Sequence, residues 1–187
     1  PVGNQPLIII MGGSQGAQVI NDVIYNLLDF LNDKNFRIVH ILGDTLDPKF
    51  NNKKNKNYIP IAFTNEIAAL MQNCDLVISR AGSGAINEII KTKSPSILIP
   101  YPNAKNNHQE KNALILSSIG CSIMIQQNKN LEINLKENLQ RIFKTESKNS
   151  ENQYKILEIM KKNISEFNLK DPRKEIKKII NYLTKDL

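Results

Sequence analysis

The residues from Ser79 to Glu88 combine glycines, hydroxyls and one carboxylate in a pattern that suits phosphate chemistry. The apolar run Leu76–Ile78 leads into them, and the residues after Ala85 have helical character. A strand that feeds a glycine-rich bend and then a helix presents backbone N–H groups to an anion. The glycines let the main chain approach closely, and the first helical turn adds positive potential. These residues therefore form a candidate phosphate site.

Glu88 adds a second kind of chemistry to this candidate site. It lies about one turn inside the predicted helix, too deep to act only as a cap. A carboxylate there can accept hydrogen bonds from neutral hydroxyls beside the phosphates. The pattern indicates a nucleotide whose ribose contacts Glu88. A tight strand–helix turn with a solvated glutamate explains the same residues about equally well, because short glycine motifs carry little specificity.

A second unit of the same kind opens the chain. Leu7–Met11 is wholly apolar, as expected of a parallel strand that is covered on both faces. The loop Gly12–Ala17 follows it and leads into a helix with an apolar stripe. Two such loops in one domain favour phosphate binding over packed turns. Ser14 could donate a hydrogen bond to a phosphate oxygen, but no base beside it activates it as a nucleophile.

The strand–helix order repeats and predicts an α/β fold with a doubly wound parallel sheet, which is Rossmann-like. Further strands are expected over Phe36–Leu42, Tyr58–Phe63, Ser96–Pro100 and Cys121–Ile125. Helices are expected from residue 134 onward, and the final one starts at Asp171. We expect residues 1–6 to be a linker, 7–165 to be the nucleotide-binding domain, and 166–187 to pack as a helix on that domain or on a further one.

Polar residues follow the other strands at the carboxyl edge of this sheet, where ligands bind. Backbone groups at Phe63 and Thr64 could pair with a base, and Thr64 can cap a helix over Asn65–Gln72. A later helix carries His108, Gln109 and Asn112 on one face. Neutral amides and an imidazole suit a sugar, whose hydroxyls both donate and accept. Ordinary capping and surface polarity explain these three residues equally simply when they are taken alone.

Composition limits the function further. The chain has 187 residues, enough for one α/β domain or for half of a larger enzyme. Its net charge is +7, which solvated loops and helix faces explain most simply. Aromatic residues are few, which argues against nucleic acid, and an anionic substrate or an acidic membrane surface suits a basic protein equally well. Cys74 and Cys121 lack metal-ligand spacing, so we expect free, buried thiols. His40, inside a predicted strand, is expected to be a satisfied core or edge histidine.

Several kinds of site are excluded by spacing. The loop Gly12–Gly16 lacks the dinucleotide spacing, and no Gly-Lys-Ser/Thr follows either loop. Neither loop carries a metal cluster, and no paired carboxylates suggest glycoside hydrolysis. The sequence therefore predicts no cofactor and no metal. A nucleotide-sugar site fits best.

Three segments together resemble the C-terminal half of the MurG family of bacterial glycosyltransferases. They are Gly12–Ala17, Ser79–Glu88 and His108–Ala113, and they occur in the order and spacing of that family. Its members transfer N-acetylglucosamine from UDP-GlcNAc to the lipid-linked muramyl-pentapeptide, which makes lipid II for peptidoglycan. The resemblance extends from Leu7 to the C-terminal helices. It implies one half of a two-domain, GT-B inverting transferase that is peripheral to the cytoplasmic face of the plasma membrane.

The resemblance also implies a role for individual residues. Those near the diphosphate are Gly13, Ser14, Arg80, Gly82, Ser83, Gly84 and Ala85. Glu88 would bind the ribose, and main-chain groups of Phe63 and Thr64 the uracil. His108, Gln109 and Asn112 would contact the N-acetylglucosamine. The family usually has threonine where Ala85 stands, so one hydroxyl donor is missing. Some members have glutamine in place of His108.

The family's general base and its acceptor-binding, membrane-contacting surface belong to the N-terminal half. We therefore expect no catalytic residue in this chain, which should bind UDP-GlcNAc without turning it over. Two alternatives stay open. The chain could be a complete subunit that recruits its acceptor half from another polypeptide. It could also be an enzyme like UDP-GlcNAc 2-epimerase, for which only Glu88 and His108 are acid/base candidates. The Ser-Gln-Gly-Ala loop favours the transferase.

Overall fold

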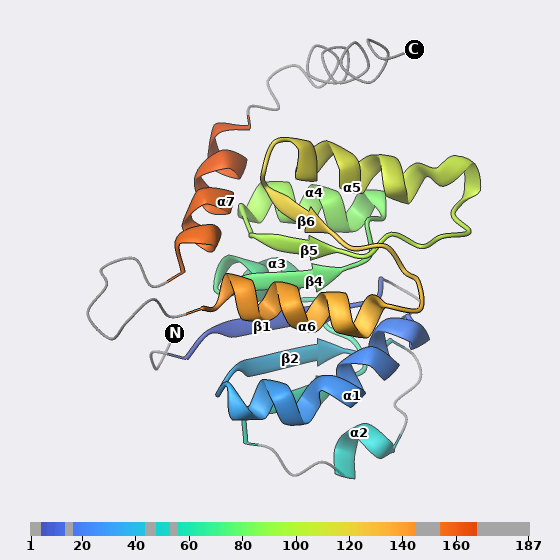
Figure 1. Ribbon diagram of the computed structural model, residues 1–187, viewed down its shortest axis with the longest axis vertical. Coiled ribbons are helices and arrows are strands. Elements are labelled where there is room, and N and C mark those ends of the chain that lie inside the picture. Colours follow the sequence, from blue (N-terminus) through green and yellow to red (C-terminus); the bar gives the residue numbers. More distant parts are fainter. Residues whose placement is uncertain (1–4, 14–16, 44–47, 53–55, 145–153, 168–187) are drawn as a thin grey trace.

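A single parallel sheet organises the molecule (Figure 1). The computed structural model describes residues 5–13, 17–43, 48–52, 56–144 and 154–167. The strands are β1 (Leu7–Met11), β2 (Arg37–Ile41), β3 (Tyr58–Ile61), β4 (Leu76–Ser79), β5 (Ser96–Leu98) and β6 (Ser122–Met124). They pair in parallel in the order β3-β2-β1-β4-β5-β6. The predicted doubly wound parallel sheet is confirmed, and its strand order reverses between β1 and β4, where ligands of this fold bind.

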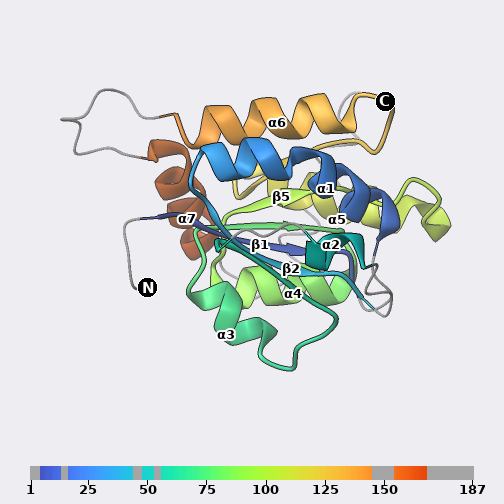
Figure 2. The ribbon, with the colours of Figure 1, turned by 90° about the horizontal axis from the view of Figure 1, so that it is seen from below.

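Helices cover both faces of the sheet. The longer ones are α1 (Gln18–Asp33), α4 (Ser83–Thr92), α5 (His108–Ser118), α6 (Leu131–Ile142) and α7 (Lys155–Glu166). The shorter ones are α2 (Lys49–Asn52), α3 (Ile67–Gln72) and the 3-10 turn η1 (Lys105–Asn107). Figure 2 shows α1 and α6 on one face, with α3 and α4 on the other. Buried residues of α5 join the cluster of α4, while α7 contributes to both clusters.

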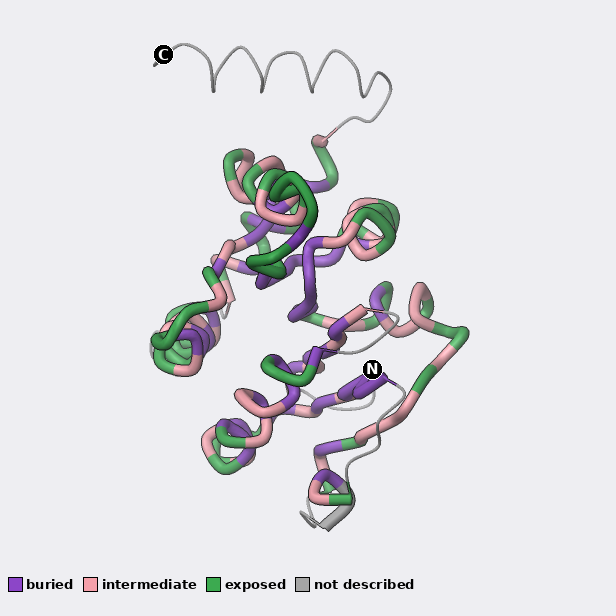
Figure 3. Tube along the Cα trace, turned by 90° about the vertical axis from the view of Figure 1, so that its right-hand side faces the viewer, coloured by how far each residue is buried: buried purple, intermediate pink, exposed green. Residues whose placement is uncertain are grey.

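The core follows directly from the apolar periodicities. In β1, Ile8 and Ile10 join one buried cluster and Ile9 joins the other, because successive strand residues point to opposite faces. This two-sided burial is why the strand is apolar throughout. The stripe of α1 is buried at helical spacing by Ile20, Ile24, Leu27, Leu28 and Leu31. Figure 3 shows the buried strands between helices that are buried only on their inner side.

Several element boundaries differ from those predicted. Helix α3 begins at Ile67 instead of residue 65, because the Thr64 hydroxyl accepts the Glu66 N–H at 3.0 Å and forms a turn before the helix. Helix α6 begins at Leu131, three residues earlier than predicted, where the Asn128 side chain accepts the Asn130 N–H at 2.9 Å. The predicted helix from Asp171 and the first four residues of the predicted linker lie outside the described residues.

Both cysteines are free, as predicted, but only Cys121 is buried, whereas Cys74 is half-buried. Burial raises the pKa of the Cys121 thiol to about 11 and is the main reason why that of Cys74 rises to about 12. No described helix is long and apolar enough to cross a bilayer. Within the described ranges, no three side chains of metal-ligating type gather at one point.

His40 is fully buried in β2, as the sequence predicted, and its burial makes stability depend on pH. Burial lowers the pKa of His40 to about 3, whereas an exposed histidine in the unfolded chain titrates near 6.5. Between these values the unfolded chain binds more protons. Stability should therefore fall as the pH drops from about 6.5 toward 3, by up to about 1.4 kcal/mol per pH unit.

Urea unfolding between pH 7.5 and 4.5 measures this slope. The variant His40→Gln should have a shallower slope than the natural chain, because its side chain does not titrate. His108 is exposed and is present in both proteins, so it does not affect the comparison. Equal slopes would contradict the assignment.

Candidate functional site

A cavity of about 940 Å³ lies at the carboxyl edge of the sheet. Its walls come from the loops that follow five of the strands and from the starts of α1, α4 and α5. The predicted site residues that line it are Gly13, Phe63, Thr64, Arg80, Gly82, Ser83, Gly84, Ala85, Glu88, His108 and Gln109. Asn112 is not part of this lining, and Ser14 lies outside the described residues. The fold thus brings four predicted segments that are distant in the sequence to one cavity.

Two helices begin at this cavity without a side-chain cap. The N-cap residue of α1 is Ala17 and that of α4 is Gly82, so neither offers a polar side chain to the first-turn N–H groups. Neither helix has an acidic residue in its first turn. Because β1 and β4 are neighbours in the sheet, the two helix starts lie close together. First-turn N–H groups that their own N-cap residue does not satisfy, and the positive ends of two helix dipoles, suit an anion.

The glycines of these loops leave room for that anion. Gly13 has a φ of +96°, a backbone conformation that residues other than glycine rarely adopt. A Cβ atom at Gly82 or Gly84 would meet no heavy atom within 4 Å. Packing among the described residues therefore does not demand glycine at those two positions, whereas close approach of a ligand to the backbone would.

Arg80 places a buried cation in the wall of the cavity. Its side chain is 7% exposed, and its Nη1 donates to the carbonyls of Ile99 at 3.1 Å and Pro100 at 3.3 Å. The ring of Tyr101 lies over the guanidinium, with its centroid 5.5 Å from Cζ. Burial lowers the pKa of Arg80. No carboxylate in the described part of the chain pairs with it, so a bound phosphate would supply the missing negative charge.

Glu88 lies in the second turn of α4 and contributes the carboxylate of the cavity. It lies five positions after Ser83, which places it about 8 Å further along the helix axis. Its Oε1 is 3.8 Å from Nζ of Lys91, whose side chain is 71% exposed. An exposed pair of this length is weak. The carboxylate therefore remains able to accept hydrogen bonds from ligand hydroxyls.

His108 and Gln109 are held by the backbone so that their remaining polar atoms are free for a ligand. The Nδ1 atom of His108 is 2.8 Å from the carbonyl of Lys105, which can only accept, so Nδ1 carries a proton. In the neutral ring, Nε2 is then an acceptor. The Oε1 atom of Gln109 accepts the Tyr101 N–H at 3.0 Å, which leaves its two amide protons. Together they offer one acceptor and two donors to a polyol.

Asn112 supports the site from behind. Its Nδ2 donates to the carbonyl of Ala81 at 2.9 Å and so ties α5 to the loop between β4 and α4. The helical spacing places Asn112 on the same face as His108, but it does not reveal that Asn112 donates a hydrogen bond to the loop between β4 and α4. Sequence reasoning also missed Tyr101, which lines the cavity at the end of a predicted strand. The signal for it was an aromatic residue directly after Pro100 at the ligand-binding edge.

Residues 7–167 match the glycosyltransferase family 28 C-terminal domain. The chain belongs to this family. It is 57% identical over 186 residues to a protein of Prochlorococcus marinus strain MIT 9312 that is named UDP-N-acetylglucosamine–N-acetylmuramyl-(pentapeptide) pyrophosphoryl-undecaprenol N-acetylglucosamine transferase. That alignment covers all of this chain and 51% of the relative. The chain thus spans about half the length of the curated relatives that it matches.

Solved structures show the same fold. The crystal structure of Acinetobacter baumannii MurG matches 88% of this chain with a TM-score of 0.73 and 23% identity, and the match covers 46% of that protein. The Streptomyces sp. SF2575 glycosyltransferase SsfS6, solved with thymidine diphosphate, matches 88% of this chain with a TM-score of 0.58 and 14% identity, over 38% of its own length. Both matches support the Rossmann-like fold of this chain.

The bond between Asn112 and Ala81 gives a test of the local structure. Asn112→Ala removes a half-buried donor and leaves the Ala81 carbonyl without that partner, so we expect a loss of about 1–2 kcal/mol in the free energy of unfolding. Asn73→Ala is the matched control, because its Nδ2 donates to the Ala69 carbonyl at 2.8 Å in an exposed place. Its cost should stay below about 0.5 kcal/mol. Urea unfolding measures both, and equal losses would contradict the assigned support.

Proposed function

We propose that this chain is the UDP-GlcNAc-binding half of an inverting N-acetylglucosaminyltransferase. Its product is lipid II, made by transfer to the lipid-linked muramyl-pentapeptide during peptidoglycan synthesis. The observation that carries the proposal is a cavity that is lined by two helix starts without a side-chain cap and by a buried arginine. The name of the Prochlorococcus relative, which is 57% identical, supports the choice of reaction.

The diphosphate of the sugar nucleotide fits between the starts of α1 and α4. Backbone N–H groups of residues 82–85 and the guanidinium of Arg80 would bind its oxygens, together with Gly13 and Ser14 on the other side. SsfS6, which has the same fold, was solved with thymidine diphosphate, so a nucleoside diphosphate is a ligand that this fold accepts. Ala85 supplies only its N–H, because it has no hydroxyl.

The nucleoside would extend from the diphosphate toward β3. Glu88 lies about one helical turn beyond the diphosphate and would accept the ribose hydroxyls. Main-chain groups of Phe63 and Thr64 would pair with uracil. The phenyl ring of Phe63 is 69% exposed at the cavity, and stacking on the base would remove that apolar surface from water.

The sugar would lie against the start of α5. In the neutral ring of His108, Nε2 accepts a hydrogen bond from a sugar hydroxyl, and the Gln109 amide donates to another. Such fixed donors and acceptors distinguish the gluco from the galacto configuration, because an inverted hydroxyl leaves polar groups unpaired. Asn112 contributes indirectly, through its bond to Ala81.

The reaction is a displacement at the anomeric carbon. A base removes the proton of the acceptor hydroxyl, the oxygen bonds to the anomeric carbon, and the bond to the β-phosphate oxygen breaks with inversion. Negative charge then develops on the leaving UDP. The N–H groups of α1 and α4 and the cation of Arg80 would stabilise it, without a metal or an organic cofactor. The base and the acceptor-binding surface are assigned to the other half of an enzyme about twice as long.

Because the acceptor carries a lipid, we propose that the enzyme works peripherally on the cytoplasmic face of the plasma membrane. The net charge of +7 favours contact with anionic lipids. Residues 1–6 would then link the two halves, and residues 166–187 would form a helix that packs on either half. Nucleic acid is not expected among the partners.

The role of Glu88 can be measured by isothermal titration with UDP-GlcNAc. Glu88→Ala should weaken binding about 10- to 150-fold, which corresponds to the roughly 1.5–3 kcal/mol of a hydrogen bond to a charged group. Glu88→Gln keeps one acceptor oxygen, so its affinity for UDP-GlcNAc should lie between those of the natural chain and Glu88→Ala. Glu137→Ala, at an exposed position of α6, is the control and should bind like the natural chain. Unchanged affinity in Glu88→Ala would remove Glu88 from the site.

The chain alone should bind UDP-GlcNAc without transferring the sugar. A radiolabelled transfer assay with the lipid-linked muramyl-pentapeptide measures this directly, and UDP-GalNAc should bind more weakly than UDP-GlcNAc in a parallel titration. Lipid II formed by this chain alone would contradict the assignment of the base to another half. Conversion of UDP-GlcNAc to its 2-epimer would favour the epimerase-like alternative instead.

A further inference from the structure

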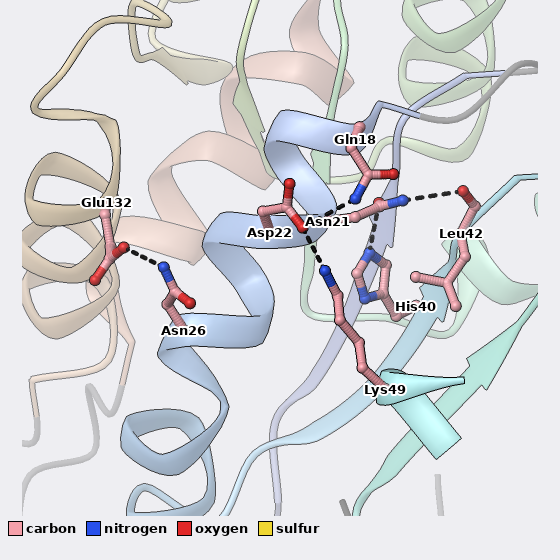
Figure 4. Close-up of polar contacts among 8 residues, drawn as sticks. All are labelled: Gln18, Asn21, Asp22, Asn26, His40, Leu42, Lys49 and Glu132. Carbon is pink, nitrogen blue, oxygen red and sulfur yellow. Dashed lines mark hydrogen bonds and ion pairs between the residues drawn. The ribbon is translucent and has the colours of Figure 1, made fainter. Parts of the chain in front are cut away.

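Four buried residues form a hydrogen-bonded chain that crosses the sheet to α1. His40 of β2 lies at its centre, with Nδ1 2.9 Å from the hydroxyl of Tyr58 and Nε2 3.1 Å from Oδ1 of Asn21. The Nδ2 atom of Asn21 donates to the carbonyl of Leu42 at 3.1 Å. All four residues are at most 5% exposed. Figure 4 shows Asn21 between His40 and Leu42.

Only one arrangement of protons satisfies every member of this chain. The Leu42 carbonyl can only accept, so Asn21 must turn its NH₂ toward it and its oxygen toward His40. That oxygen also only accepts, so Nε2 of His40 carries a proton. Burial keeps the ring neutral and its pKa low, which makes Nδ1 an acceptor. The Tyr58 hydroxyl therefore donates to Nδ1, and the chain runs in one direction from β3 to the end of β2.

This chain ends at two walls of the cavity. Asn21 lies in the first turn of α1, where its N–H bonds the carbonyl of Ala17 at 2.9 Å, and residues 17–19 line the cavity. Leu42 directly precedes Gly43, which lines it as well. Beside it, Asp22 accepts Nε2 of Gln18 at 2.9 Å and Nζ of Lys49 at 2.6 Å, as Figure 4 also shows.

These hydrogen bonds fix the position and orientation of the first turn of α1, which its apolar stripe alone does not. Apolar contacts are non-directional and tolerate small shifts of a helix along or about its axis. Hydrogen bonds fix distance and angle, and a fully satisfied buried network specifies one arrangement. Further along α1 the buried residues are Ile24, Leu27, Leu28 and Leu31, and Asn26 donates to Glu132 at 2.9 Å in an exposed place. The buried directional bonds of α1 therefore lie at the end that faces the cavity.

We propose that His40 is a positioning residue for sugar-nucleotide binding. Through Asn21 it fixes the first turn of α1 against the end of β2, and so aims the uncapped N–H groups of that turn at the diphosphate. His40 itself does not line the cavity. The inference rests on the proposed function for its ligand, while the geometry that it assigns to α1 holds with or without a ligand.

Two variants of His40 separate positioning from stability. A glutamine amide reaches the place of Nε2, so His40→Gln keeps a donor toward Asn21. An asparagine is one methylene shorter and keeps only an acceptor toward Tyr58. Both lose ring packing against Phe50, whose centroid lies 5.6 Å away. We expect similar losses of stability in the two variants. UDP-GlcNAc affinity should stay within about 3-fold of the natural chain in His40→Gln and fall at least about 10-fold in His40→Asn, the loss of one buried hydrogen bond.

Amide hydrogen exchange without ligand gives an independent reading. His40→Asn should speed exchange of the N–H groups of residues 21–23 and leave those of residues 28–31 unchanged, whereas His40→Gln should leave both protected. Equal exchange in the two variants, or uniform loss along α1, would overturn the inference. Failure of the natural chain to bind UDP-GlcNAc would count against the proposed function alone, because the exchange data would still decide whether His40 fixes this turn.

Discussion

Backbone N–H groups that no side chain caps determine what the carboxyl edge of this sheet can bind. A helix that starts at alanine or glycine cannot satisfy its first-turn donors with its own cap, as happens at Ala17 and Gly82. The parallel pairing of β1 with β4 brings both starts to one cavity. A diphosphate supplies several acceptor oxygens that can satisfy these donors at once. The other site residues are arranged around this requirement.

Those residues are held in place from behind the cavity. Arg80 bonds two carbonyls of the loop that follows β5, and Gln109 accepts an N–H from the same loop. Asn112 ties α5 to Ala81, and Asn21 ties α1 to Leu42. Each of these side chains hydrogen-bonds the backbone through one of its polar groups. The groups that face the ligand are therefore fixed before it arrives, which lowers the entropy lost on binding.

The sequence predicted the sheet and the location of the site because both follow from local patterns. An apolar run such as Ile8–Ile10 is diagnostic of a buried parallel strand, and parallel strands deliver the following loops to one edge. The placements of Glu88 and His108 at the cavity are consequences of that rule. The roles assigned to them, and to Ser14 outside the described residues, stay predictions.

What sequence reasoning missed depends on contacts between distant segments. Asn112 was expected at the sugar, and only the fold shows that one of its two amide protons bonds a carbonyl 31 residues away. Asn21 breaks no helical pattern, since a polar residue within α1 is ordinary, and only the fold shows that His40 faces it. Helix α3 starts two residues later than predicted, and the Thr64 hydroxyl accepts the Glu66 N–H in the turn before it.

The most direct measurement is the set of backbone amide NMR shifts of this chain on titration with UDP and, separately, with uridine. The account predicts that UDP shifts the amides of residues 82–85 and 18–20, while uridine shifts those near Phe63 and Thr64 and leaves the helix starts nearly unchanged. Such a difference isolates the diphosphate from the base. Shifts of equal size with both ligands at the helix starts, or UDP shifts that avoid them, would contradict the claim that two uncapped helices bind the diphosphate.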